Sequence, residues 1–145
     1  MLGVVLKMVV RVRVRLINEG TGHNVEVIML VNGGAESEIP VVVVTPDIAT
    51  DLGLDLSNMD LIDVELASGV TRNYISRNTI LVQLLDDEGK VLSQTRVYVA
   101  VDENLTEPLM TDATIDELGI QVISFRRGLW RHTNDPPNTV RKSAK

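Results

Sequence analysis

The spacing of apolar side chains predicts a chain built from short strands. Residues 9–17 alternate between valine or leucine at the even positions and Arg11, Arg13 and Arg15 at odd positions. A period of two is typical of a half-exposed antiparallel strand. We expect the arginine face of this strand to protect a sheet edge against further pairing.

Two apolar runs around a short polar loop form the centre of the pattern. Val25–Val31 and Val41–Val44 are rich in β-branched residues and predict two buried strands. The loop between them opens with Asn32, Gly33 and Gly34. One interpretation is a β-turn in which Asn and Gly supply unusual φ values. The other is a rigid loop that presents Asn32, the one strong hydrogen-bonding side chain there.

The remaining pattern predicts more strands and two short helices. Further strands are expected over residues 61–67, 70–75, 79–85, 91–101 and 122–125. Ser68-Gly69 and residues 86–89 mark hairpin turns. Helices are expected over residues 46–52 and 112–118, with Thr45 and Thr111 or Asp112 as N-caps and with Gly53 and Gly119 as stops.

Composition supports an all-β domain without metal or cofactor chemistry. The 145 residues are 44% hydrophobic but only 3% aromatic, so Val, Ile and Leu must build the core. There is no cysteine, which excludes disulfides and thiolate ligands. His23 and His132 lie too far apart in sequence for a local metal motif, and the acidic loops match no cation-binding pattern.

The opening segment does not predict a membrane span. No apolar run reaches the roughly 18–20 residues that a bilayer requires. Residues 1–10 are apolar, but Lys7 interrupts them and no small-residue cleavage site follows. We therefore expect a strand that begins the fold, in a cytoplasmic protein without membrane contact.

Charge divides the chain into an acidic body and a basic end. The net charge is −6; residues 1–125 hold 8 basic and 19 acidic side chains, and residues 126–145 hold 6 and 1. An acidic body does not suit nucleic-acid binding. We expect residues 126–145 to form an extended arm and a disordered tail, whose charges are solvated, lie on the body or touch an acidic partner. Trp130 should pack on its own domain or on a second copy.

Two segments carry a resemblance to a known family. Residues 30–35, Leu-Val-Asn-Gly-Gly-Ala, resemble the apolar–apolar–Asp–Thr/Ser–Gly–Ala signature of retropepsin-like aspartic proteases. Residues 107–120 resemble the second signature of that fold, and residues 128–131, Gly-Leu-Trp-Arg, resemble the end of its archaeal members. The resemblance implies an all-β, retropepsin-like closed barrel with one or two short helices over residues 1–125.

The resemblance also implies a homodimer in which each protomer supplies one catalytic loop. Asn32 occupies the position of the family aspartate, and it has no titratable proton to serve as a general base. Gly33 replaces the bracing Thr or Ser, and Gly34 matches the family glycine. In the second signature Met110 and Thr111 replace Gly and Arg, so an ion pair from that Arg to Glu36 or Glu38 is lost.

The hairpin around Ser68 corresponds to the family's flap, although an ordinary surface hairpin fits the pattern equally. Expected substrate-binding residues are Ala35, Glu36, Ser68, Gly69 and Val70.

Two functions follow from the resemblance and its departures. The first is a catalytically impaired homodimer that binds an extended peptide or protein segment by strand addition. The alternative is an aspartic endopeptidase with weak or unusual activity, although neither Asp112 nor Glu36 occupies the position of the missing aspartate.

Overall fold

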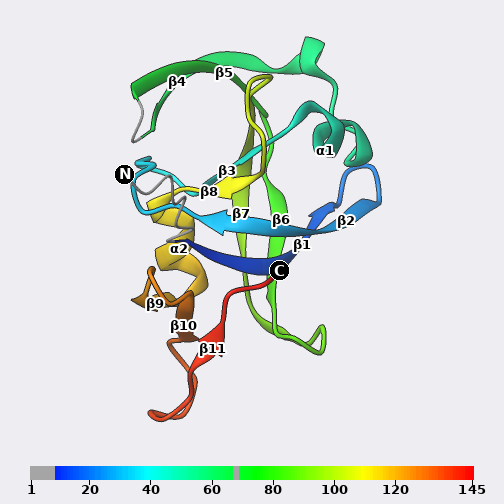
Figure 1. The fold of residues 1–145 in the computed structure, drawn as a ribbon. Helices are drawn as coiled ribbons and strands as arrows, with labels where there is room; N and C mark the ends of the chain where they lie inside the picture. The colour runs from blue at the N-terminus through cyan, green and yellow to red at the C-terminus, as the bar shows by residue number, and fades with distance from the viewer. Residues whose placement is uncertain (1–8, 67–68) are drawn as a thin grey trace.

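The computed structural model describes residues 9–66 and 69–145 (Figure 1). The strands are β1 (Val10–Asn18), β2 (His23–Val31), β3 (Val41–Val44), β4 (Asp60–Leu66), β5 (Gly69–Ile75), β6 (Ile80–Leu85), β7 (Val91–Val101), β8 (Leu109–Met110), β9 (Ile120–Ser124), β10 (Leu129–His132) and β11 (Arg141–Lys142). The helices are α1 (Pro46–Asp51), α2 (Asp112–Leu118) and a 3-10 turn, η1 (Leu56–Asn58).

Six strands form a closed barrel. Their order is β3-β8-β2-β1-β6-β7, and parallel pairing of β3 with β7 closes the ring. The short β8 lies between β2 and β3, parallel to the first and antiparallel to the second. The prediction of a mostly β closed barrel with two short helices is therefore confirmed.

Strand β1 lies in the middle of the barrel wall. Its even-numbered side chains, Val10 to Leu16, are at most 1% exposed, as the alternating pattern predicts. The predicted role of the arginine face in protecting an edge is wrong, because β2 and β6 pair with the two sides of β1. The arginines instead lie on the outside of the barrel, where Arg11 forms an ion pair with Glu107 at 2.8 Å.

The helices begin where the sequence predicts, but their caps differ. Neither Thr45 before α1 nor Thr111 before α2 caps its helix with a side-chain hydrogen bond. The Thr111 hydroxyl lies 3.1 Å from the carbonyl oxygen of Val41 instead. Gly119 ends α2 with a φ of +74°. In the described part of the chain no helix is long and apolar enough to cross a membrane.

The β4–β5 hairpin arches over one end of the barrel (Figure 1). Strand β5 pairs with β7 at only two positions, Tyr74 with Val101 and Ile75 with Ala100. A second apolar cluster lies below the hairpin, separate from the barrel core. Its buried members are Ala35, Val41, Val43, Ala100 and Leu109, with Ile75 packed against them. The hairpin is therefore held to the barrel by its base.

Residues 126–145 differ from the predicted arm and disordered tail. Strand β10 pairs with β9 and β11 in a three-stranded sheet, which extends below the barrel in Figure 1. Trp130 is only 4% exposed and belongs to the main core of its own chain. Its Nε1 donates to the Lys142 carbonyl at 3.3 Å, and Arg141 lies 5.7 Å from its ring centroid. Tertiary packing of Trp130 thus orders a segment whose local composition predicts disorder.

Candidate functional site

The loop after β2 is closed by the side chain of Asn32. Gly34 N–H donates to Asn32 Oδ1 at 3.0 Å, and Ala35 N–H donates to the Asn32 carbonyl at 3.1 Å. Neither Gly33 nor Gly34 takes a positive φ, so the interpretation that they supply unusual φ values is wrong. The asparagine side chain mimics a backbone turn and closes the loop with ordinary dihedral angles.

The three residues predicted to be catalytic share one small hollow. It has a volume of about 420 Å³, and Asn32, Gly33 and Gly34 line it together with Val9, Leu30, Val31 and Phe125. Asn32 is partly exposed there. The predicted catalytic residues therefore lie together in this hollow.

A groove of about 710 Å³ lies between the β4–β5 hairpin and the loop that follows Ala35. We call it the hairpin groove. Its apolar residues are Ile39, Val41, Ile62, Val70 and Ile75, and its polar residues are Glu36, Ser37, Glu38, Asp63, Thr111 and Asp112. Both walls carry aliphatic side chains, and residues from the start of α2 contribute to one side. Such a mixture of apolar walls and a few fixed polar groups is typical of a binding cleft.

Hydrogen bonds to Asp112 fix one side of this groove. Asp112 Oδ1 accepts the N–H of Ser37 at 3.0 Å and the N–H of Ala113 at 2.8 Å. The Asp112 N–H donates to the Ala35 carbonyl at 2.9 Å. Asp112 therefore lies beside the loop, and its carboxylate holds the loop backbone in place. Because its Oδ1 accepts these two hydrogen bonds, the Asp112 carboxylate fixes the position of the loop at one side of the groove.

Thr111 stands where the resemblance places an arginine. It is fully buried, and its Oγ1 lies 2.7 Å from Ser37 Oγ and 3.1 Å from the Val41 carbonyl oxygen. Glu36 and Glu38, the acidic residues that would meet an arginine, make no ion pair within the described residues. Neutral hydroxyl contacts therefore stand where the resemblance places the family's ion pair, and both carboxylates are exposed at the groove.

The hairpin groove is acidic. Four of its lining residues, Glu36, Glu38, Asp63 and Asp112, carry carboxylates, and none is Lys, Arg or His. Asp63 lies 3.3 Å from Arg72, but both side chains are more than half exposed, so this pair is weak. Carboxylates along a cleft concentrate negative potential in it. The groove therefore favours a ligand that carries positive charge beside apolar groups.

Asn73 is a buried amide in the β4–β5 hairpin. It pairs directly with Ile62 in the β4–β5 ladder and lies two residues from Ile75, so the three side chains share one face. Asn73 is 1% exposed, and neither its Nδ2 nor its Oδ1 has a hydrogen-bond partner among the residues that the structure describes. A buried amide without partners costs about 1–3 kcal/mol, which makes it a candidate for binding a ligand.

The predicted substrate-binding residues divide into three groups. Glu36 and Val70 line the hairpin groove. Ala35 is fully buried beneath it, and Gly69 begins β5 with a φ of +130°. Ser68 lies outside the residues that the structure describes.

The prediction of substrate-binding residues missed nine of the eleven described residues that line the groove, namely Ser37, Glu38, Ile39, Val41, Ile62, Asp63, Ile75, Thr111 and Asp112. The sequence could have indicated Ile62, because the alternation of β4 places its side chain on one face of the predicted hairpin. Thr111 and Ser37 had no such signal, because only the tertiary fold brings the two hydroxyls together.

Neither histidine belongs to the groove. His132 is 2% exposed; its Nε2 lies 3.0 Å from the Leu118 carbonyl oxygen, and its Nδ1 accepts the N–H of Asn134 at 3.2 Å. Ser37 therefore has no histidine base among the groove residues. In the described segments, no three His, Asp or Glu side chains gather as a metal site.

Comparison with known proteins assigns no family. No protein-family model matches the sequence, and no curated protein matches it at significant similarity. The hairpin groove and the Asn32 loop are therefore the features from which a function is inferred.

Proposed function

We propose that the chain is a catalytically impaired, retropepsin-like homodimer that binds an extended peptide or protein segment. The observation that carries this proposal is the hairpin groove, which runs between the β4–β5 hairpin and the loop after β2. Its aliphatic walls suit alternate apolar side chains of an extended ligand, and its four carboxylates suit basic ones. We therefore expect a ligand in which basic and apolar residues are mixed.

Backbone groups near the groove support strand addition. Strand β4 is the outermost strand of its sheet, so within the described residues its outer side has no strand partner. Main-chain hydrogen bonds to such an edge provide affinity, while side-chain pockets provide specificity. The Asn73 amide offers one donor and one acceptor group, which matches the N–H and C=O of a peptide unit.

The chemistry of Asn32 supports the loss of catalysis. An amide does not titrate, so it takes no proton from water and gives none to a scissile carbonyl. Its Oδ1 already accepts a hydrogen bond from Gly34. The alternative, a weak aspartic endopeptidase, is favoured by one observation, which is that the Asp112 carboxylate lies against the loop.

Binding can be tested with a labelled peptide library and fluorescence anisotropy. We expect peptides that mix basic and apolar residues to bind best, and Val70→Arg to weaken binding at least tenfold, because it places a cation in the groove. Val91→Arg is the matched control, since Val91 is also exposed but does not line the groove. Equal binding by the two variants would rule out the hairpin groove as the site.

Catalysis can be tested by peptide-library cleavage between about pH 3 and 7. We expect no cleavage by the natural sequence and cleavage by the double variant Asn32→Asp/Gly33→Thr, which restores the family loop. Cleavage by the unaltered protein that disappears in Asn32→Ala would instead establish the endopeptidase alternative.

A further inference from the structure

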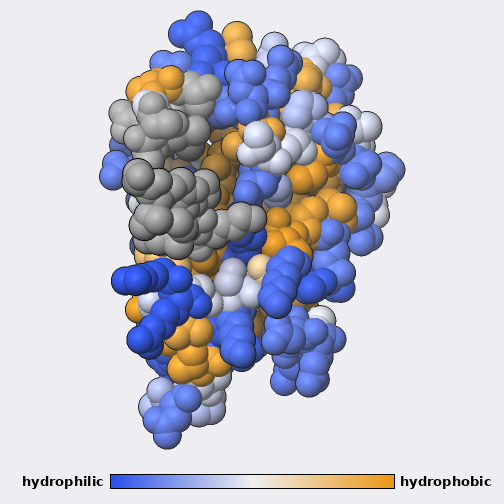
Figure 2. Space-filling model, in the orientation of Figure 1, coloured by the Kyte–Doolittle hydropathy of each residue, from blue (hydrophilic) through white to orange (hydrophobic). Residues whose placement is uncertain are grey.

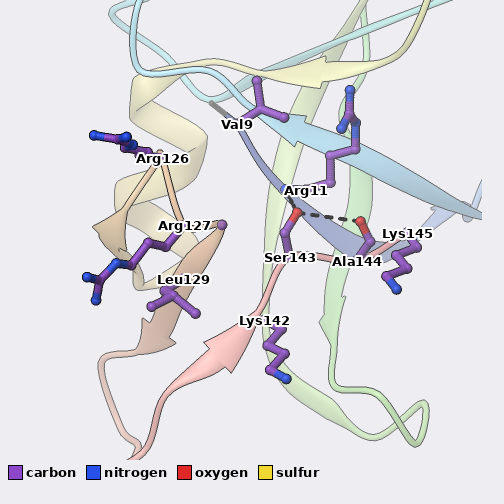
Figure 3. A pocket seen from close by; sticks show the side chains of 10 residues that line it. Val9, Arg11, Arg126, Arg127, Leu129, Lys142, Ser143, Ala144 and Lys145 are labelled. Carbon is purple, nitrogen blue, oxygen red and sulfur yellow. Dashed lines mark hydrogen bonds between the residues drawn. The ribbon is translucent and has the colours of Figure 1, made fainter. Parts of the chain in front are cut away.

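A second groove lies on another part of the molecule (Figure 3). It has a volume of about 680 Å³, and the start of β1, the turn before β10 and residues 142–145 form it. Five of its ten lining residues are basic, namely Arg11, Arg126, Arg127, Lys142 and Lys145, and none is acidic. We call it the basic groove. It shares no residue with the hairpin groove.

Four of the five cations of this groove are available to a ligand. Arg11 is paired with Glu107, whereas Arg126, Arg127, Lys142 and Lys145 make no ion pair in the part of the chain that the structure describes. Figure 3 shows the side chains of Arg126 and Arg127 on one side and those of Lys142 and Lys145 on the other. These charges therefore do not lie paired on the acidic body, which is one of the arrangements that the sequence left open.

The backbone around the basic groove is held by long-range hydrogen bonds. Ser143 N–H donates to the Gly128 carbonyl at 2.7 Å, and Ala144 N–H donates to the Arg11 carbonyl at 2.7 Å. Arg11 N–H donates to Ser143 Oγ at 2.8 Å. Three segments far apart in the sequence are thus tied together. A ligand would meet cations on a preformed surface, which reduces the entropy lost on binding.

Apolar surface separates the charges. Val9, Leu129 and Ala144 line the same groove. The space-filling view shows strongly hydrophilic residues in the lower part of this face, with apolar residues among them (Figure 2). A compact anion needs several donors at one point, whereas cations spread around apolar side chains suit a longer ligand.

We propose that the basic groove binds an extended acidic segment of a partner protein. The four cations that make no ion pair within the described residues allow successive Asp or Glu side chains to contact different basic residues, while the apolar surface receives the intervening side chains. Nucleic acid is disfavoured, because the net charge of residues 1–125 is −11 and repels a long polyanion. A short acidic segment avoids that repulsion, since it meets the basic groove alone.

The test is fluorescence anisotropy with three labelled probes at low and high salt. The probes are a peptide with Glu at alternate positions, the same peptide with Lys, and a single-stranded oligonucleotide of equal charge. We expect the Glu peptide to bind the basic groove, with affinity falling as salt rises. The Lys peptide should bind only in the hairpin groove, so Val70→Arg should weaken its binding and leave that of the Glu peptide unchanged. Arg126→Glu/Arg127→Glu should lower that affinity at least tenfold. The milder Arg126→Gln/Arg127→Gln should lower it less.

The matched control is Arg72→Glu/Arg77→Glu, which makes the same charge change at two exposed arginines of the hairpin region. This control should bind the Glu peptide nearly as well as the natural sequence, and so should Val70→Arg. The proposal is overturned by tighter binding of the oligonucleotide, by displacement of the peptide by millimolar inorganic phosphate, or by unchanged affinity in both Arg126/Arg127 variants. Circular dichroism establishes that each variant is folded.

Discussion

Two asparagines show how differently one residue type behaves in this protein. Asn32 satisfies its own loop, because its side chain accepts the N–H of Gly34. Asn73 is buried in the hairpin, and neither of its amide atoms is paired within the described residues. A fold that needed only stability would place an aliphatic residue at position 73. The unpaired amide is therefore expected to cost stability, and it is a candidate group for contact with a ligand.

Asn73→Leu should stabilise the protein and weaken peptide binding. Removing an unpaired buried amide while keeping the volume should raise the free energy of unfolding by about 1–2 kcal/mol. Urea unfolding followed by circular dichroism measures this gain. Asn78→Leu, at an exposed position, is the control and should change the free energy of unfolding by less than about 0.5 kcal/mol. A loss of stability in Asn73→Leu would show that the amide has partners after all.

Asp135 should make stability depend on pH in acid. The Arg141 guanidinium, which bonds to both of its oxygens at 2.7 and 2.8 Å, lowers the pKa of Asp135 from its ordinary value near 3.8 to about 2. Because the pKa of Asp135 is lower in the folded protein than in the unfolded chain, the ionised carboxylate stabilises the folded state at a pH above about 3.8. This contribution is lost as the pH falls towards 2. A pKa shift of this size corresponds to about 2 kcal/mol of stability. Little of it is lost to solvent screening, because the Asp135 side chain is only 7% exposed.

Urea unfolding of Asp135→Asn and the natural sequence at several pH values checks this. The variant should be less stable at pH 6, and the difference should shrink between about pH 4 and pH 2. Glu103→Gln, which removes an exposed carboxylate, should show no such trend. If the difference in stability between the two proteins stayed constant with pH, the ion pair of Asp135 with Arg141 would not be its cause.

At the scale of elements, the sequence predicted best where contacts are local. The alternation of β1 and the two predicted helices depend on neighbours within a turn or a strand, and the structure has both. Residues 126–145 were mispredicted because Pro, Gly and basic residues suggest disorder, while the burial of Trp130 depends on the distant main core. The hairpin groove was found only in part, since Thr111 and Ser37 meet across the fold.

Trp130 should contribute strongly to stability. It is 4% exposed in the main core, so Trp130→Ala should lower the free energy of unfolding by about 3–5 kcal/mol. Val140→Ala is the control, because Val140 is 54% exposed and the variant should lose less than about 1 kcal/mol. Urea unfolding followed by circular dichroism compares them. Similar small losses in both variants would contradict the packing of residues 126–145 on the barrel.

At the scale of the whole molecule, the proposed dimer directs attention to the Asn32 hollow. Phe125 lines that hollow, and Phe125 and Ile123 of the same chain are 43% and 48% exposed. Exposed apolar side chains beside a loop suit contact with the same surface of a second copy. The homodimer and the peptide-binding function are proposed together, but they can fail separately.

Light scattering at micromolar concentration tests the dimer. We expect a mass near twice 16.0 kDa for the natural sequence and a mass near 16.0 kDa for Phe125→Glu, because a buried carboxylate opposes association. Val140→Glu, at a position that is 54% exposed and outside the hollow, should leave the mass of the dimer unchanged. A monomer mass for the natural sequence would end the dimer proposal and leave the hairpin groove to be tested on its own.

The parallel closure of β3 on β7 also has a kinetic consequence. Antiparallel neighbours such as β1 and β2 are joined by a short turn, and their pairing can extend outward from that turn. Val41 instead pairs with Tyr98, and three strands, β4, β5 and β6, lie between the two residues in the sequence. Because distant pairing costs loop entropy before it returns contact energy, closure of the ring belongs late in folding. Refolding should therefore be slow for a domain of this size, with the ring seam forming last.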